Sequence, residues 1–146
     1  MPASSTSLPS FWLLKSEPET WSWEDQKTQK TTAWDGVRNY QAAGNMKKMR
    51  VGDLAFFYHS GSERKIVGIV RITKPYYPDP TDLSHRFGMV DVTFEKTLND
   101  PIPLARIKSE TCLEHLALVR QSRLSVMPID ENSWKYLCML GKTSAP

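Results

Sequence analysis

The sequence predicts an α+β domain built on a small, mostly antiparallel, barrel-like sheet. Apolar, β-branched and aromatic runs of strand length recur along the chain. Short helical patterns interrupt them without the regular strand–helix–strand alternation of a parallel sheet. The chain has 146 residues, enough for one domain with a hydrophobic core. Neither a repeat nor a linker divides residues 11–141, so we expect a single domain there.

Each expected strand is bounded by Gly, Pro, Asp or another turn residue, and most expected helices begin at a residue that can cap the first turn. The expected strands are residues 11–16, 31–34, 54–60, 66–73, 89–98 and 124–129. The expected helices are a short turn opened by Ser22 and Asp25, a helix from Asn39 to about Met49, residues 103–109, a helix from Thr111 to residue 120, and one from Asp130 to the C′ glycine Gly141.

Three stretches carry more detailed expectations. Gly68, inside an apolar strand, predicts a bulge or a close backbone approach. The prolines of PYYPDPTD (residues 75–82) predict no regular structure there. In AFFYHS (residues 55–60), alternation places Phe57 and His59 on one face and Phe56 and Tyr58 on the other. One pair must belong to the core, and the sequence leaves open which.

Composition excludes several classes of protein. No apolar run approaches the roughly 18–20 residues of a membrane span. Residues 1–10, rich in Ser and Pro, do not resemble a secretory signal and predict a disordered tail, and residues 142–146 are expected to form a C-terminal tail. Cys112 and Cys138 lack the spacing of metal ligands, so we expect buried free thiols, no metal and an intracellular protein, nuclear or cytoplasmic.

The net charge is +3 and the sequence pI is about 8.9. Such a mild excess of basic residues is typical of a solvated surface, and equally of a protein whose partner carries phosphates. Charge alone does not choose between them.

Seven short motifs together resemble the EVE domain family. A single match would be weak, but their order along nearly the whole chain after residue 10 is specific. The motifs are WLLKSEP (12–18), WDGVRNYQA (34–42), GDLAFFYHS (52–60), IVGIV (66–70), YPDPT (77–81), MVDV (89–92) and RLSVMPI (123–129).

The resemblance implies a PUA-like pseudobarrel, the superfamily that includes the YTH and SRA readers of methylated bases. It also implies a domain that binds nucleic acid, DNA or RNA, without a cofactor. The expected ligand is a modified base, methylated or oxidised, turned out of its strand.

A flipped base needs aromatic walls, fixed donors and acceptors, and cations outside. WDGVRNYQA offers these groups, with Trp34 as a wall standing clear of the core, Asn39 for a base edge and Arg38 for a phosphate. The alternative is that Trp34 is core, Arg38 a surface charge and Asn39 only a helix cap. The resemblance places Phe87 where the family often has Trp. Either the pocket accepts a different base, or Tyr76 or Tyr77 fills the gap.

Further candidates come from strand ends and basic clusters, each with a structural alternative. Lys15 reads equally well as a solvated strand end, Ser125 as a backbone partner, and Lys47 and Lys48 as complements of a helix dipole. The full set for the base pocket is Ser16, Trp34, Asn39, Tyr58, His59, Ser60, Tyr77, Phe87 and Ser125, and for phosphate Lys15, Arg38, Lys47, Lys48 and Arg123.

No catalytic motif is evident. His59 and Ser60 point to opposite faces of a strand, and Glu17 and Asp35 are the only carboxylates that we expect to meet at the barrel mouth. The sequence carries neither a Gly-rich phosphate loop nor a zinc deaminase signature. We therefore expect a non-catalytic, monomeric binding module. The alternatives are a protein-interaction domain that uses the Pro/Tyr loop, residues 75–80, and a small enzyme that acts on a nucleobase or nucleotide.

Overall fold

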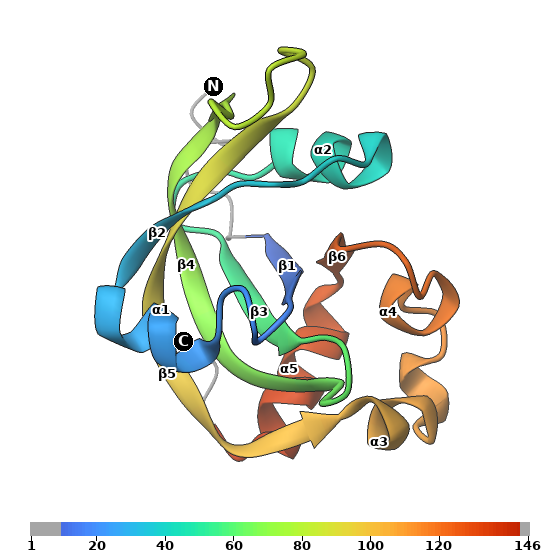
Figure 1. The fold of residues 1–146 in the computed structure, drawn as a ribbon. Helices are drawn as coiled ribbons and strands as arrows, with labels where there is room; N and C mark the ends of the chain where they lie inside the picture. Colours follow the sequence, from blue (N-terminus) through green and yellow to red (C-terminus); the bar gives the residue numbers. More distant parts are fainter. Residues whose placement is uncertain (1–9, 144–146) are drawn as a thin grey trace, which may run out of the picture.

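The computed structural model describes residues 10–143 (Figure 1). Six strands form one curved sheet in the order β2-β5-β4-β3-β1-β6. All neighbouring strands are antiparallel except β1 and β3, which are parallel, so the predicted α+β class with a mostly antiparallel sheet is confirmed. The strands are β1 (Phe11–Ser16), β2 (Thr31–Trp34), β3 (Leu54–His59), β4 (Lys65–Pro78), β5 (Gly88–Pro103) and β6 (Val126–Ile129).

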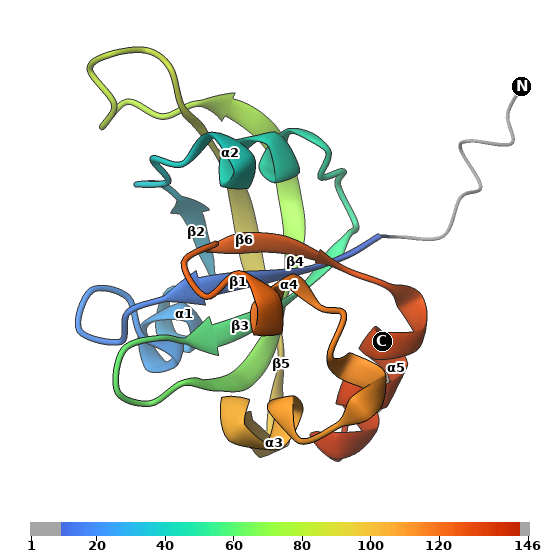
Figure 2. The same ribbon diagram turned by 90° about the vertical axis from the view of Figure 1, so that its right-hand side faces the viewer.

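The helices are short and lie around this sheet. Figure 2 shows α2 on one side of β1 and β6, with α3, α4 and α5 on the other side. They are α1 (Trp23–Gln29), α2 (Tyr40–Lys47), α3 (Leu104–Lys108), a 3₁₀ turn (Thr111–Leu113), α4 (Ala117–Arg120) and α5 (Glu131–Leu140). The predicted tails, residues 1–10 and 142–146, lie almost wholly outside the described residues.

Local capping signals place three helix starts where the sequence predicts them. Ser22 and Asp25 form a reciprocal capping box, each side chain accepting from the other's backbone N–H at 3.0 Å. The Asn39 carboxamide accepts from the Ala42 N–H at 2.9 Å, and Asp130 caps α5. Each cap satisfies an N–H that the first helical turn leaves without a partner.

The structure differs from two predicted helix boundaries, the start at Thr111 and the end at Gly141. Thr111 does not cap a helix, because residues 111–120 break into the 3₁₀ turn and α4. Gly141 has φ −79°, so it is not the left-handed C′ glycine expected. A Cβ there would lie 1.9 Å from Cδ2 of Leu98, so a larger residue would require the Leu98 side chain to shift.

Strands β4 and β5 extend beyond their predicted ends. The expectation of no regular structure over residues 75–82 is wrong as far as Pro78, where β4 ends. Pro75 is tolerated because it falls in a register shift between Lys74 and Tyr77, where the ladder does not require its missing N–H. β5 likewise continues past Leu98 to Pro103.

The core has two aromatic halves separated by β3, which is buried along its whole length. On one side Phe56 stacks on Trp134 of α5, with ring centroids 4.0 Å apart. On the other, Phe57 lies 4.9 Å from Trp23 and 5.4 Å from Trp34. Both faces of β3 are therefore core.

Gly68 has the role predicted for it. A register shift lies beside it in β4, and a Cβ there would sit 2.1 Å from the Trp23 ring. The cysteines differ from expectation, since Cys138 is buried but Cys112, in the 3₁₀ turn, is exposed. Burial raises the pKa of Cys138 to about 11.

Candidate functional site

A hollow of about 500 Å³ opens between the end of β1 and strand β2. This size falls within the usual range of small-ligand sites. We call it the Trp pocket, after the two indoles in its lining. It is lined by Lys15, Ser16, Glu17, Thr20, Trp21, Thr32, Ala33, Trp34, Asp35 and Gly36.

Trp34 is both a wall of the Trp pocket and part of the core. It is only 7% exposed, and its ring meets Phe57 edge to face. Its position is fixed by β2, where it pairs with Val90 of β5. The expectation that its ring stands clear of the core is wrong, although Trp34 is also a lining residue of the pocket.

Trp21 is the second indole, and it was not among the residues predicted from the sequence. It is half-buried in the loop between β1 and α1. Its Nε1–H donates to Gln26 Oε1 at 2.9 Å, and its carbonyl accepts from Ser16 Oγ at 2.5 Å. An aromatic directly before the Ser22 cap was the signal that could have identified it, because that position commonly packs against the helix it precedes.

Charged groups of both signs line the Trp pocket. Glu17 and Asp35 are exposed carboxylates, so the two acids expected at the mouth do share one hollow. Lys15 donates to the Ser122 carbonyl at 2.9 Å and lies 5.6 Å from the Tyr58 ring centroid. Burial lowers the pKa of Lys15, because it disfavours the charged amine.

Asp79 of the YPDPT motif holds the WDGVRNYQA segment in place. It is buried and accepts from the Gly36 N–H at 2.9 Å, from Arg38 at 3.1 Å and from Thr81. Burial alone would raise the pKa of Asp79, but hydrogen bonds from Thr81, Gly36 and Arg38 outweigh it and lower the pKa to about 2. Gly36 has φ +81°, a conformation that glycine adopts without strain. Arg38, predicted to bind phosphate, is thus already paired with a carboxylate.

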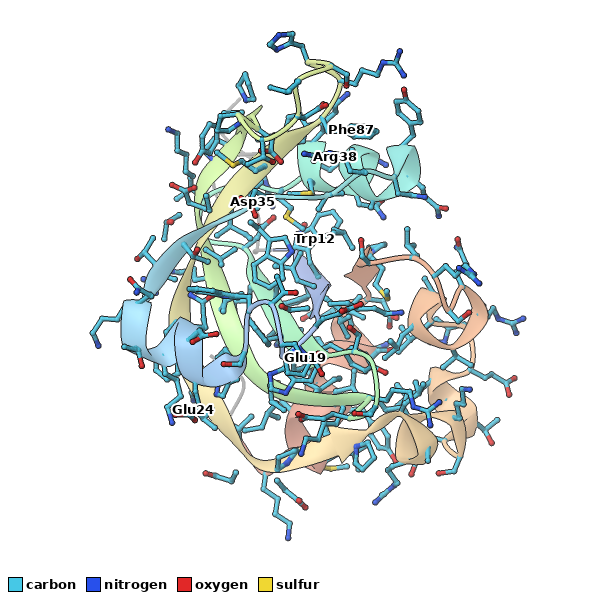
Figure 3. All side chains as sticks on the ribbon, viewed as in Figure 1. Trp12, Glu19, Glu24, Asp35, Arg38 and Phe87 are labelled. Carbon is cyan, nitrogen blue, oxygen red and sulfur yellow. The ribbon has the colours of Figure 1, made fainter. Side chains whose placement is uncertain are left out.

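Phe87 lies away from the Trp pocket. Asp82 shapes its loop by accepting from the Ser84, Arg86 and Phe87 backbone N–H groups. The Phe87 ring contacts Tyr40 at 5.0 Å and lies 5.9 Å from the Arg38 guanidinium. Figure 3 shows Phe87 and Arg38 together beside α2, well apart from Glu19 in the loop that carries Trp21.

Asn39 lines a different hollow, of about 340 Å³, together with Arg120, Arg123 and Ser122. Its oxygen caps α2, so the predicted cap is confirmed. The structure does not bring Asn39 into the Trp pocket. Arg123 likewise belongs to this second hollow.

Tyr58 and Ser60 line a third hollow, which also includes Lys15. His59 does not join them. Its Nε2 accepts from the Trp23 N–H at 2.9 Å, so Nδ1 carries the proton and donates to Glu63 at 2.9 Å. His59 therefore ties α1 to β3 and has neither ring nitrogen free for a base.

The remaining predicted residues also lie outside the Trp pocket lining. The Tyr77 hydroxyl donates to Asp91 at 2.5 Å, Lys47 lies over the Tyr76 ring, and Lys48 is exposed. The main-chain carbonyl of Ser125 accepts from the Lys15 backbone N–H, a bond that does not involve the Ser125 side chain. Tyr76 also accepts from the Gly88 N–H, so both tyrosines of the Pro/Tyr segment are held within the protein.

No helix within residues 10–143 is long and apolar enough to cross a membrane. Over the same residues, no three His, Cys, Asp or Glu side chains are grouped closely enough to hold a metal ion.

Residues 10–140 match the model of the EVE domain. The chain belongs to the EVE domain family. Human thymocyte nuclear protein 1 is 36% identical to this EVE domain over 91% of the chain and 74% of the human protein. The recognition made from the seven motifs is therefore confirmed.

Solved structures agree with this EVE domain closely. A protein from Agrobacterium tumefaciens, Atu2648, superposes with a TM-score of 0.89 at 40% identity, over 94% of this chain and 96% of that one. The human protein, solved in complex with DNA containing 5-methylcytosine, superposes with a TM-score of 0.86 at 35% identity, over 93% and 99%. A YTH domain from Zygosaccharomyces rouxii has a TM-score of 0.56 at 17% identity, a likeness of fold that agrees with the predicted PUA-like class.

Proposed function

We propose that this EVE domain is a non-catalytic reader that binds a modified nucleobase, turned out of a DNA or RNA strand, in the Trp pocket. The observation that carries the proposal is a single hollow of about 500 Å³ that combines two indoles, two carboxylates and one lysine. Bases present π-faces that stack on aromatic side chains, at roughly 1–3 kcal/mol per base. The human relative, solved with DNA that contains 5-methylcytosine, supports the ligand class.

The carboxylates favour a base that presents an amino group. Glu17 and Asp35 are acceptors when ionised, and both line the Trp pocket. The exocyclic amines of cytosine and adenine are donors that such acceptors bind. We propose modified cytosine first, because the human relative was solved with DNA that contains 5-methylcytosine, and modified adenine second.

The phosphates flanking the flipped base meet only a modest excess of positive charge. With a net charge of +3, we expect a few phosphates to be neutralised and a slope of log K against log salt of roughly −2 to −4. One monomer should bind one modified base. The name of the human relative makes the nucleus the natural place to seek this protein.

Fluorescence anisotropy tests the proposal. Labelled single-stranded and duplex oligonucleotides would carry cytosine, 5-methylcytosine, adenine or N6-methyladenine at one central position. We expect tighter binding to a modified strand than to its unmodified counterpart, and a loss of about tenfold in Trp21→Ala. Met139→Ala, at an exposed position on α5, is the matched control and should bind as wild type does. Equal affinity for all strands, or a slope of zero against salt, would refute the proposal.

The same samples test the enzymatic alternative, since Glu17 and Asp35 share one hollow. Mass spectrometry of each oligonucleotide after long incubation should return an unchanged mass. A changed mass that depends on Glu17 would instead make the Trp pocket an active site.

A further inference from the structure

A basic hollow of about 210 Å³ lies beside the Trp pocket, where the turn between β3 and β4 approaches α3 and α4 (Figure 1). We call it the Arg64 hollow. Its polar lining comes from Lys15, Tyr58, Ser60, Arg64, Lys108 and Ser122, and its remaining lining includes no carboxylate.

The cations of the Arg64 hollow are not neutralised within the protein. Arg64 and Lys108 are exposed and form no ion pair among residues 10–143. Lys15 donates only to the Ser122 carbonyl and lies over the Tyr58 ring. Like charges collected around one hollow repel each other, and an anion bound between them removes that repulsion.

A second, independent feature of the Arg64 hollow is the Tyr58 hydroxyl. Tyr58 is only 2% exposed, yet its hydroxyl has no hydrogen-bond partner among the described residues. Among the described residues, the fully buried side-chain N or O atom without a partner is Trp134 Nε1, so the unpartnered Tyr58 hydroxyl is open to the hollow. Burial raises the pKa of Tyr58, while the nearby Arg64 charge acts to lower it. The hydroxyl is thus a neutral donor that lines the hollow beside a guanidinium group.

We propose that the Arg64 hollow binds a phosphate group, namely the backbone phosphate next to the base held in the Trp pocket. This inference rests on the proposed function for its source of phosphate. A backbone phosphate carries one negative charge on two non-bridging oxygens, each of which can accept more than one hydrogen bond, and so suits a hollow with three cations and the hydroxyls of Tyr58 and Ser60.

Lys15 connects the two sites. It lines both the Trp pocket and the Arg64 hollow, so the two lie within reach of one lysine side chain. The parallel pairing of β1 with β3 places Lys15 opposite Tyr58 at the strand ends. A base and its neighbouring phosphate can therefore occupy the two hollows together, with Lys15 between them.

A pair of double variants with equal charge tests the proposal. Arg64→Gln/Lys108→Gln removes two cations of the Arg64 hollow. Lys135→Gln/Lys142→Gln removes two cations that are paired with Glu131 and Asp100 instead. Both lower the net charge equally, so any general effect of charge on binding is the same.

For oligonucleotides that wild type binds, we expect the Arg64→Gln/Lys108→Gln variant to lose about tenfold in affinity, for every sequence alike. Its slope against salt should shrink by about one. Tyr58→Phe, which removes only a hydroxyl, should lose a few-fold. If wild type binds but both double variants show the same affinity and slope, the phosphate site is refuted and the proposed function stands.

Titration with inorganic phosphate, followed by amide NMR of ¹⁵N-labelled protein, distinguishes a failure of the phosphate site from a failure of the proposed function. We expect saturable shifts at Ser60 and Gly61 in wild type and in the Lys135→Gln/Lys142→Gln control, and none in the Arg64→Gln/Lys108→Gln variant. If wild type binds no oligonucleotide, the proposed function fails. Phosphate shifts would then still support an anion site for free phosphate, and their absence would refute the site as well.

Discussion

The two tryptophans of the Trp pocket are held in different ways. Trp34 belongs to β2, is 7% exposed and packs edge to face on Phe57 at the centre of the core. Trp21 belongs to a loop, is half-buried and is held by two hydrogen bonds, from its indole to Gln26 and from Ser16 to its carbonyl. Trp34 is therefore a pocket wall that belongs to the core, and Trp21 is a pocket wall that a loop holds against the core by hydrogen bonds.

This difference separates stability from binding. A change at Trp34 removes core packing and a pocket wall together, so its effect on binding cannot be measured alone. A change at Trp21 alters the pocket and leaves the buried aromatic cluster of Phe57, Trp23 and Trp34 complete. Trp21 is therefore the better residue for testing ligand binding.

The largest expected effect is on stability in Trp34→Ala. Replacing a buried Trp by Ala typically costs about 3–5 kcal/mol in the free energy of unfolding. For a chain of this size we expect the melting temperature to fall by about 10 °C or more. Trp21→Ala is the control and should lose less, about 1–3 kcal/mol, because it removes a half-buried ring and leaves the buried Gln26 carboxamide without its donor. Equal losses in the two variants, measured by thermal and urea unfolding, would remove the contrast between the walls.

The features that depend on a few neighbouring residues could be predicted from the sequence. The Ser22, Asn39 and Asp130 caps and the β1 and β2 strands follow from a few neighbouring residues each. Pocket membership depends on tertiary contacts. Asn39 and Trp34 are close in sequence, yet they line different hollows because Asp79, distant in sequence, pulls Gly36 and Arg38 toward the β4–β5 connection.

Asp79→Asn should show the next largest effect. An amide in place of the carboxylate leaves the Arg38 guanidinium or the Gly36 N–H without a full partner, at a cost of about 1–3 kcal/mol. The segment that follows Trp34 would loosen, so the β2 wall would lose its anchor while Trp21 kept both of its hydrogen bonds. Urea unfolding at neutral pH would measure the loss, and an unchanged stability would contradict it.

The pH dependence of the same variant sharpens this prediction. The pKa of Asp79 is lowered from 3.8 to about 2 in the folded state, so the folded protein holds its proton less tightly than the unfolded chain does. The resulting stabilisation is complete above about pH 4 and is lost as the pH falls through about 2. We expect wild type to lose more stability than Asp79→Asn over that interval. Parallel curves would mean that Asp79 has the same pKa in both states.

Ser16→Ala should have a smaller effect, directed at the other wall. The Ser16 hydroxyl donates to the Trp21 carbonyl, so its loss frees the loop that carries this indole. We expect stability to fall by about 0.5–1.5 kcal/mol, the usual worth of one hydrogen bond. Affinity for a modified oligonucleotide should fall as well, because a mobile wall pays an ordering cost on binding. Ser125→Ala, whose side chain lines none of the three hollows described above, is the control and should bind as wild type does.

The smallest effect belongs to Asn39→Asp. Asp caps a helix about as well as Asn, and its charge complements the dipole at the start of α2, so stability should change by only a few tenths of a kcal/mol. Asn39→Ala removes the bond to the Ala42 N–H and should cost about 0.5–2 kcal/mol. Because Asn39 lies outside the Trp pocket, the preference among modified bases should be the same in wild type and Asn39→Asp. An altered preference would mean that the ligand reaches from the two tryptophans to the start of α2, and that the base is read across two hollows rather than within one.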